Sequence, residues 1–141
     1  MPVEKRIACD PRSLSSYVNG AACYMQMKTF PRAGELLRKA LELKPDFHAG
    51  FNNRGVAFIM LERYGDAEKD LTIAYELDPD DGNTMVRLAE LYSAKNDVVE
   101  ACKWLKQGVK KGYRDWKYLK TAPTFDNLRK WPCYEWALSG K

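Results

Sequence analysis

Apolar and small residues recur along this chain with a period of thirty-four residues, and the recurrence is clearest between Phe51 and Pro79. Ala67, for example, has counterparts in Ala33 and Ala101. Other columns also keep the size of the residue: Tyr24, Phe58 and Tyr92; Leu37, Leu71 and Leu105; Ala21, Gly55 and Ala89; Ala40, Ala74 and Gly108. Large residues suit places where a helix fills space, and small ones suit places where two helices approach closely. The pattern therefore predicts stacked helical repeats.

Each period is predicted to contain two helices joined by a short turn. Apolar residues at three-to-four spacing predict helices over 14–27 and 31–43, from Asp46 to 61 and over 65–77, and over 83–94 and 97–110. Ser13 or Asp10 is expected to cap the first helix, and Asp46 the third. Asp80 or Asp81 is expected to start the third pair.

These columns resemble the tetratricopeptide-repeat (TPR) family, whose unit is an antiparallel helix pair of this period. The resemblance covers residues 12–112 and implies an all-α, right-handed α-solenoid of three helix pairs in a single domain, 1–141. The repeats are expected at 12–45, 46–79 and 80–112. The third departs from the pattern, because Lys111 stands in a leucine column and Tyr113 replaces the proline.

Both ends of the chain fall outside the three repeats. In residues 1–11, Val3 to Cys9 has the register of the end of a preceding helix, and we favour a fragment of a longer repeat protein over a short cap. Residues 113–141 resemble the segment that closes many bacterial TPR proteins. They predict short helices over 115–120 and 132–138. Six side chains are expected to cover the third repeat: Trp116, Leu119, Phe125, Leu128, Trp131 and Trp136.

Charge is distributed unevenly along the chain. Before Cys102 there are 13 Lys and Arg against 16 Asp and Glu, and from Cys102 onward 10 against 3. Lys103, Lys106 and Lys110 share a helical face near several tryptophans, so nucleic acid or an acidic partner is a possible ligand of the basic tail. A solvated helix face explains the same residues more simply, and nucleic acid is the less favoured alternative.

The four cysteines and the single histidine do not cluster as metal ligands do, so we predict neither a metal nor a cofactor. Cys23 and Cys102 are expected to be small buried residues in a reducing compartment. No apolar run reaches the roughly 18 residues that span a bilayer, and no signal peptide is visible, which favours a cytoplasmic location. His48 has no evident catalytic partner, and we predict no catalytic residue and no enzyme activity.

The first helix of each pair is expected to line a concave groove. Residues on the helix side away from the buried stripe are expected to face this groove. One such column of equivalent positions holds Asn19, Asn53 and Arg87. A carboxamide can bond the backbone of an extended peptide, and an arginine can hold a carboxylate. The remaining predicted contacts are Asn52, Met60 and Glu90. The sequence thus favours a protein-interaction adaptor or scaffold.

Two further hypotheses stay open for the repeats. The stretch around Asn53 resembles co-chaperones that clamp the carboxylate of heat-shock chaperones, and Asn53 and Arg87 match clamp positions. Val18, Ala22 and Asn83 do not match them, so a generic extended peptide or helix is favoured. Alternatively, the incomplete helix at Val3 to Cys9 leaves the first repeat uncovered, and another copy of the chain stacks there to form a homo-oligomer.

Overall fold

The computed structural model describes residues 13–139. The predicted helix end at Val3 to Cys9 and the alternative cap Asp10 lie outside the described residues. Contacts divide the chain into two compact units that meet in sequence between Leu77 and Asp78, close to the predicted boundary between the second and third repeats. No helix in 13–139 is long and apolar enough to cross a membrane.

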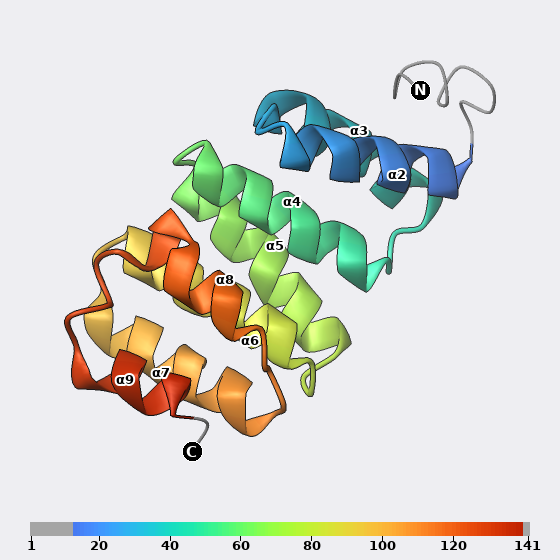
Figure 1. Ribbon diagram of the computed structural model, residues 1–141. Coiled ribbons are helices and arrows are strands. Elements are labelled where there is room, and N and C mark those ends of the chain that lie inside the picture. The colour runs from blue at the N-terminus through green and yellow to red at the C-terminus, as the bar shows by residue number, and fades with distance from the viewer. Residues whose placement is uncertain (1–12, 140–141) are drawn as a thin grey trace. The chain divides into compact units, whose positions relative to one another are not determined.

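The first unit contains two antiparallel helix pairs (Figure 1). Its helices are α2 (Leu14–Gln26), α3 (Phe30–Leu43), α4 (His48–Met60) and α5 (Tyr64–Leu77). Helix α3 packs against both α2 and α4, and α4 packs against α5. Ala33, Leu37 and Leu71, all from the repeated columns, are fully buried. The periodicity therefore predicted both helix pairs correctly, because the recurring apolar columns form the contacts between helices.

The predicted helix caps agree with the structure only in part. The Ser13 hydroxyl accepts from the Ser16 amide at 3.4 Å and caps α2. The predicted cap Asp46 is wrong, because α4 begins at His48 and its N-cap residue is Phe47, which makes no side-chain hydrogen bond. The turn inside each pair contains a residue with positive φ at the same place in the period: Lys28, Glu62 and Asn96, at 60°, 59° and 65°.

The second unit contains the third helix pair and the C-terminal segment (Figure 1). Its elements are α6 (Gly82–Ala94), α7 (Val98–Lys110), α8 (Trp116–Thr121), the 3-10 helix η1 (Pro123–Phe125) and α9 (Pro132–Leu138). Asp81, Asp97 and Asp115 cap α6, α7 and α8. A Cβ on Gly82 would lie 2.8 Å from the Gly108 carbonyl oxygen, so glycine permits the close approach of α6 and α7.

The C-terminal segment is an incomplete fourth repeat. Helices α2, α4, α6 and α8 begin at residues 14, 48, 82 and 116, and helices α3, α5, α7 and α9 begin at 30, 64, 98 and 132. The thirty-four-residue period therefore continues to the last helix. Both helices of this pair are short, with 6 and 7 residues against 13 in α6 and in α7. Pro123 stops α8 in the column of Gly55 and Ala89.

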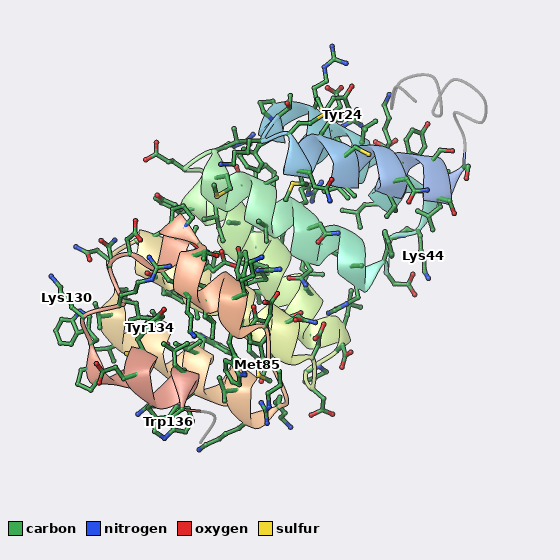
Figure 2. The ribbon with its side chains drawn as sticks, in the orientation of Figure 1. Tyr24, Lys44, Met85, Lys130, Tyr134 and Trp136 are labelled. Carbon is green, nitrogen blue, oxygen red and sulfur yellow. A yellow bond between two sulfur atoms is a disulfide. The ribbon has the colours of Figure 1, made fainter. Side chains whose placement is uncertain are left out.

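The incomplete repeat closes the core of the second unit. Leu119, Phe125 and Leu128 are fully buried in one cluster with residues of α6 and α7, which confirms their predicted role. Trp116 and Trp136 pack partly against this cluster. Trp131 does not cover the repeat as predicted, since 43% of it is exposed. On α9, Tyr134 is buried in this cluster, whereas Trp136 lies at its edge and is only half-buried (Figure 2).

A disulfide between Cys102 on α7 and Cys133 on α9 fastens the last helix to the third repeat. The prediction that Cys102 is a free buried thiol is therefore wrong. Sequence separation concealed the pair, because the two cysteines are 31 residues apart and only the fold brings their Cα atoms to 5.7 Å. Cys23 remains a free thiol that packs against the core of the first unit.

Candidate peptide-binding surface

In the first unit, α2 and α4 expose the stripe of side chains that the helical geometry predicts. On α2 all four members are exposed: Ser15, Asn19, Ala22 and Gln26. On α4, Asn53 and Met60 are exposed, and Val56 between them is half-buried. The carboxamides of Asn19 and Asn53 stand at the same place in successive repeats. Each has two donors and an acceptor available to an extended backbone.

Asn52 does not belong to this exposed stripe. It is only 9% exposed, and its Oδ1 atom has no hydrogen-bond partner in the structure. The prediction placed Asn52 on the same face as Asn53 because the two residues are consecutive in the sequence. Adjacent positions nevertheless lie about 100° apart around the axis, so Asn52 turns away from the exposed face. The prediction that Asn52 contacts a peptide directly is therefore wrong.

A partly buried ion pair between α4 and α5 was not predicted from the sequence. Arg54 donates from Nε and Nη2 to the two carboxylate oxygens of Asp70, at 2.7 and 2.9 Å. This hydrogen bond and the charge of Asp70 raise the pKa of Arg54 despite its desolvation. The sequence contained a sign of this pair, because the charged Arg54 stands in a column that holds Gly20 and Leu88 in the neighbouring repeats.

A cavity of about 540 Å³ opens beside this pair. It is lined by Pro31, Gly34, Glu35, Arg38, Arg54, Phe58, Leu61 and Arg63. Its three arginines are already engaged: Arg54 with Asp70, Arg38 with Glu42, and Arg63 with Asp66. The charge of each arginine is thus balanced by a neighbouring carboxylate.

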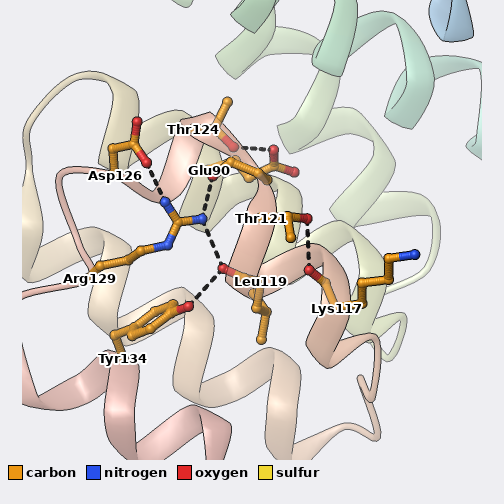
Figure 3. Close-up of polar contacts among 9 residues, drawn as sticks. Glu90, Lys117, Leu119, Thr121, Thr124, Asp126, Arg129 and Tyr134 are labelled. Carbon is orange, nitrogen blue, oxygen red and sulfur yellow. Dashed lines mark hydrogen bonds and ion pairs between the residues drawn. The ribbon is translucent and has the colours of Figure 1, made fainter.

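In the second unit, Glu90 is fully buried and cannot contact a ligand as predicted. It accepts hydrogen bonds from the Tyr118 hydroxyl at 2.5 Å and from the Thr124 hydroxyl at 2.6 Å, and Figure 3 shows the latter. The prediction assumed that this position on α6 faces open solvent, as the equivalent positions Ala22 and Val56 do to a greater degree. Helix α8 and η1 cover it instead.

Arg87 is held by the same cluster. Its Nη1 atom lies 2.7 Å from Glu90 Oε1, and its guanidinium lies 4.8 Å from the centre of the Tyr118 ring. Burial is the largest single influence and disfavours the charged form of Arg87, but the charge of Glu90, its hydrogen bond and the nearby tyrosines together outweigh burial and raise the pKa of the guanidinium. Burial and the nearby Glu90 charge likewise raise the pKa of Tyr118. The positive charge of Arg87 is therefore balanced by Glu90 within the unit.

Two arginines of the basic tail hold the incomplete repeat together. Arg129 donates to the carbonyl oxygens of Leu119 and Ala122, at 3.2 and 2.7 Å, and pairs with Asp126 (Figure 3). The Tyr134 hydroxyl donates to the same Leu119 oxygen at 2.9 Å. Arg114 donates to the carbonyl oxygen of Val109 in α7 and to that of Tyr113 in the loop after it. Part of the basic character of the tail is thus structural.

The lysines of the second unit differ in their partners. Lys103 lies 3.9 Å from Glu100, Lys106 lies over the Trp136 ring, and Lys111 binds Asp80 at 2.7 Å, which lowers the pKa of Asp80. Lys117 and Lys120 are exposed on α8 and have no ion pair within the described part of the chain.

Comparison with known proteins agrees with this architecture. The family description "Tetratricopeptide repeat" matches residues 14–47, and a second match with the same description covers residues 58–122. The chain belongs to the tetratricopeptide-repeat family. The second TPR match extends through α8, as expected if the C-terminal segment continues the repeats.

Three relatives illustrate how far the similarity reaches. Hsp70-Hsp90 organizing protein 2 of Arabidopsis thaliana is 32% identical over 75 residues, which are 53% of this chain and 13% of that protein. The chain thus spans about an eighth of that relative's length. The crystal structure of MamA has a TM-score of 0.74 at 17% identity over 98% of this chain and 84% of its own. The first TPR of Spaghetti, bound to an HSP90 peptide, has a TM-score of 0.68 at 18% identity over 92% and 96%. The two structures show that this chain has the all-α fold of TPR solenoids.

Proposed function

We propose that this TPR chain is a non-enzymatic protein-interaction module that binds an extended peptide of a partner on the exposed faces of its first helices. The observation that carries the proposal is the exposed stripe of the first unit, where Asn19 and Asn53 recur one repeat apart. Such carboxamides can pair with the donors and acceptors of an extended backbone whatever its side chains are. Met60, 37% exposed on the same stripe, adds an adaptable apolar contact.

The relatives support a peptide ligand without identifying it. The TPR of Spaghetti is bound to an HSP90 peptide, and the TPR2B domain of yeast Sti1 is in complex with an Hsp70 peptide. This chain keeps only Asn53 and Arg87 of the clamp pattern, and Arg87 is paired with Glu90. A ligand held chiefly by its backbone therefore fits this chain better than one held by its terminal carboxylate.

The proposal is tested by selecting binders from a library of random dodecapeptides. We expect the wild-type chain to enrich a set of related peptides, and Asn19→Ala with Asn53→Ala to weaken their binding by roughly fivefold, since each lost hydrogen bond contributes about 0.5 to 1.5 kcal/mol. The matched control is Thr72→Ala with Glu76→Ala, two exposed changes on α5. Equal affinity in the asparagine variant and the control would move the site away from these helices.

Self-assembly remains a second candidate, favoured by a difference within the first unit. Cys23 and Met25 on α2 are half-buried, whereas Ala57 and Ile59 in the same columns of α4 are 0% and 3% exposed. This face of α2 could be covered by another copy of the chain. Light scattering across a hundredfold range of concentration would reveal such a complex, and Met25→Glu should abolish it. A constant monomer mass would end this hypothesis.

The redox state of two cysteines can test the cytoplasmic location that was predicted from the sequence. A disulfide such as Cys102–Cys133 is rare in cytosolic proteins, whose thiols are kept reduced. We therefore expect one of two results when thiols are alkylated in intact cells before extraction. Labelling of both cysteines would support a cytoplasmic protein, and their protection would support an oxidising compartment.

A further inference from the structure

The cavity of about 540 Å³ in the first unit, which we call the arginine cavity, shares no residue with the exposed stripe of α2 and α4. Its walls come from α3, from α4 and from the turn that leads into α5, and they include Arg38, Arg54 and Arg63. Its volume is within the range of ligand sites, roughly 300 to 1,000 Å³. The arginine cavity is therefore a separate candidate site within one compact unit.

Gly34 leaves the arginine cavity open. This residue lies inside α3 without a positive φ, and a Cβ added to it would meet no atom within 4 Å. Neither its backbone conformation nor a close neighbour requires glycine, although glycine is unfavourable in the interior of a helix. The other repeats have larger residues at the same place, Glu68 and Cys102. A local preference broken without a structural need is typical of a functional site, and its effect here is to keep space free.

The equivalent place in the second unit is closed. Cys102 stands two periods after Gly34, and its disulfide to Cys133 fastens α9 against α7. The residue two periods before Cys133 is Gly65, and a Cβ added there would also meet no atom within 4 Å. The first unit thus has glycine at both positions where the second unit has a covalent bridge. No side chain of its own bridges α3 to α5 at these positions.

The walls of the arginine cavity favour stacking over ion pairing. A carboxylate bonds the N–H groups at the edge of a planar guanidinium and leaves its two faces available to an aromatic ring. Phe58 already uses this property, because the guanidinium carbons of Arg54 and Arg63 lie 5.6 and 4.7 Å from the centre of its ring. Stacking on Phe58 occupies only one face of Arg63. Arg38 and Arg63 are both exposed, so an entering ring can reach them.

We propose that the arginine cavity binds an aromatic side chain, best a tryptophan, that projects from a partner protein. Phe58 and Leu61, both half-buried, supply apolar contact. Arg38 and Arg63 supply guanidinium faces, on which tryptophan stacks better than other rings. The indole N–H can also donate to Glu35, which lines the cavity.

Other ligand classes fit the arginine cavity less well. A carboxylate gains little from arginines whose charges are already balanced, and an aliphatic side chain cannot stack on them. Tryptophan and arginine are enriched among the residues that dominate the affinity between proteins, which favours the side chain of a partner over a free small molecule. This binding is independent of the proposed function, because the two sites share no residue.

A designed peptide tests the proposal. The probe is a dodecapeptide of glycine and serine with blocked ends and one central fluorotryptophan, and the wild-type chain should broaden its fluorine NMR signal in a saturable manner. The same peptide with unlabelled tryptophan should displace the probe. Peptides with a central leucine or aspartate should be roughly tenfold less effective, since neither side chain stacks on a guanidinium.

Three variants locate the binding. Gly34→Leu should abolish it while leaving the midpoint of urea unfolding, followed by circular dichroism, no lower than in wild type, because the new side chain enters open space. The matched control is Glu76→Leu, which adds the same side chain at an exposed position of α5 outside the cavity and should bind like wild type. Arg38→Gln should weaken binding roughly threefold through the loss of one guanidinium, and it tests the site even if Gly34→Leu is unstable.

Each other outcome is decisive. No saturable binding by wild type, or equal binding by Gly34→Leu and wild type, would overturn the inference. Equal displacement by the leucine peptide would show that the ring is not recognised, and displacement by the aspartate peptide alone would identify an anion site; both results would also overturn it. Asn19→Ala with Asn53→Ala should bind the probe like wild type. Loss of binding in this variant alone would assign the probe to the exposed stripe, which would overturn this inference and support the proposed function.

Discussion

Helices α4 and α6 occupy the same place in successive repeats, yet they present different surfaces. On α4, Asn53 is exposed and its neighbour one turn on, Val56, is half-buried. On α6 the equivalent positions are Arg87, held by an ion pair, and Glu90, fully buried beneath the incomplete fourth repeat. A position in the period fixes which way a side chain points. The neighbouring element decides whether a ligand can reach it.

The comparison also separates two uses of buried charge. In the first unit, Arg54 and Asp70 form an isolated pair within one helix pair. In the second, Glu90 receives three donors from two helices and η1, so it ties the fourth repeat to the third. We expect the loss of Glu90 to disturb a larger part of the structure than the loss of Arg54.

The largest expected effect comes from Glu90→Ala. It would leave the guanidinium of Arg87 and two hydroxyl groups without their acceptor, and breaking a buried pair in this way costs about 3 to 5 kcal/mol. All four tryptophans lie in the second unit, so their fluorescence during urea unfolding reports on this unit.

Glu90→Gln is the matched control, because it keeps an acceptor for Tyr118 and Thr124 while removing the charge. It should cost less than the alanine change. Glu35→Ala, an exposed change in the first unit, should leave the tryptophan transition unchanged. Equal stability of Glu90→Ala and wild type would show that the cluster contributes nothing to docking of the fourth repeat.

Removal of the disulfide should be nearly as large and confined to the second unit. The bond closes a loop across a separation of 31 residues, and the entropy that such a cross-link removes from the unfolded chain corresponds to about 3.7 kcal/mol. Treatment with a dithiol reductant should lower the midpoint of the tryptophan transition. Cys102→Ser with Cys133→Ser should abolish this response, whereas Cys23→Ser should retain it. A reductant response in the double variant would contradict the assignment.

A smaller effect is expected from Arg54→Leu, which leaves Asp70 buried and unpaired. Because Arg54 retains 22% of its side-chain exposure, we expect a cost of about 2 to 3 kcal/mol. The double change Arg54→Leu with Asp70→Leu should recover most of this loss, since the neighbouring repeats have apolar or small residues in both columns. The stability of each variant is measured by following helix content with circular dichroism during urea unfolding. Failure of the double change to recover stability would mean that the pair also specifies packing.

The contrast between α4 and α6 also marks what the sequence could predict. Residue size in the repeated columns predicted the helices and their pairing, because the columns are the contacts. Exposure of Asn19 and Asn53 followed from helical rotation alone. Burial of Glu90 did not, because it depends on Tyr118 and Thr124 from a segment whose register is hidden by its short helices and two prolines. Extending the period past Gly112 would have revealed that Trp116 begins a fourth pair.

The smallest expected effect on stability is that of Tyr118→Phe, and this variant is informative because the effect should depend on pH. Below about pH 10 the change removes one of the three hydrogen bonds to Glu90 and should cost about 1.5 kcal/mol, the lower end of the range for a bond to a charged group. The pKa of Tyr118 is raised in the folded state above the value of about 10 for an unfolded chain, so its neutral form stabilises the fold at lower pH and this contribution is lost as pH rises above 10. Wild type should therefore lose stability between about pH 10 and 12, and Tyr118→Phe should lose less. Tyr113, whose pKa burial raises to about 12, contributes to the slope that remains. Parallel stability curves for the two proteins above pH 10 would show that Tyr118 is accessible to water, and hence that α8 does not cover Glu90.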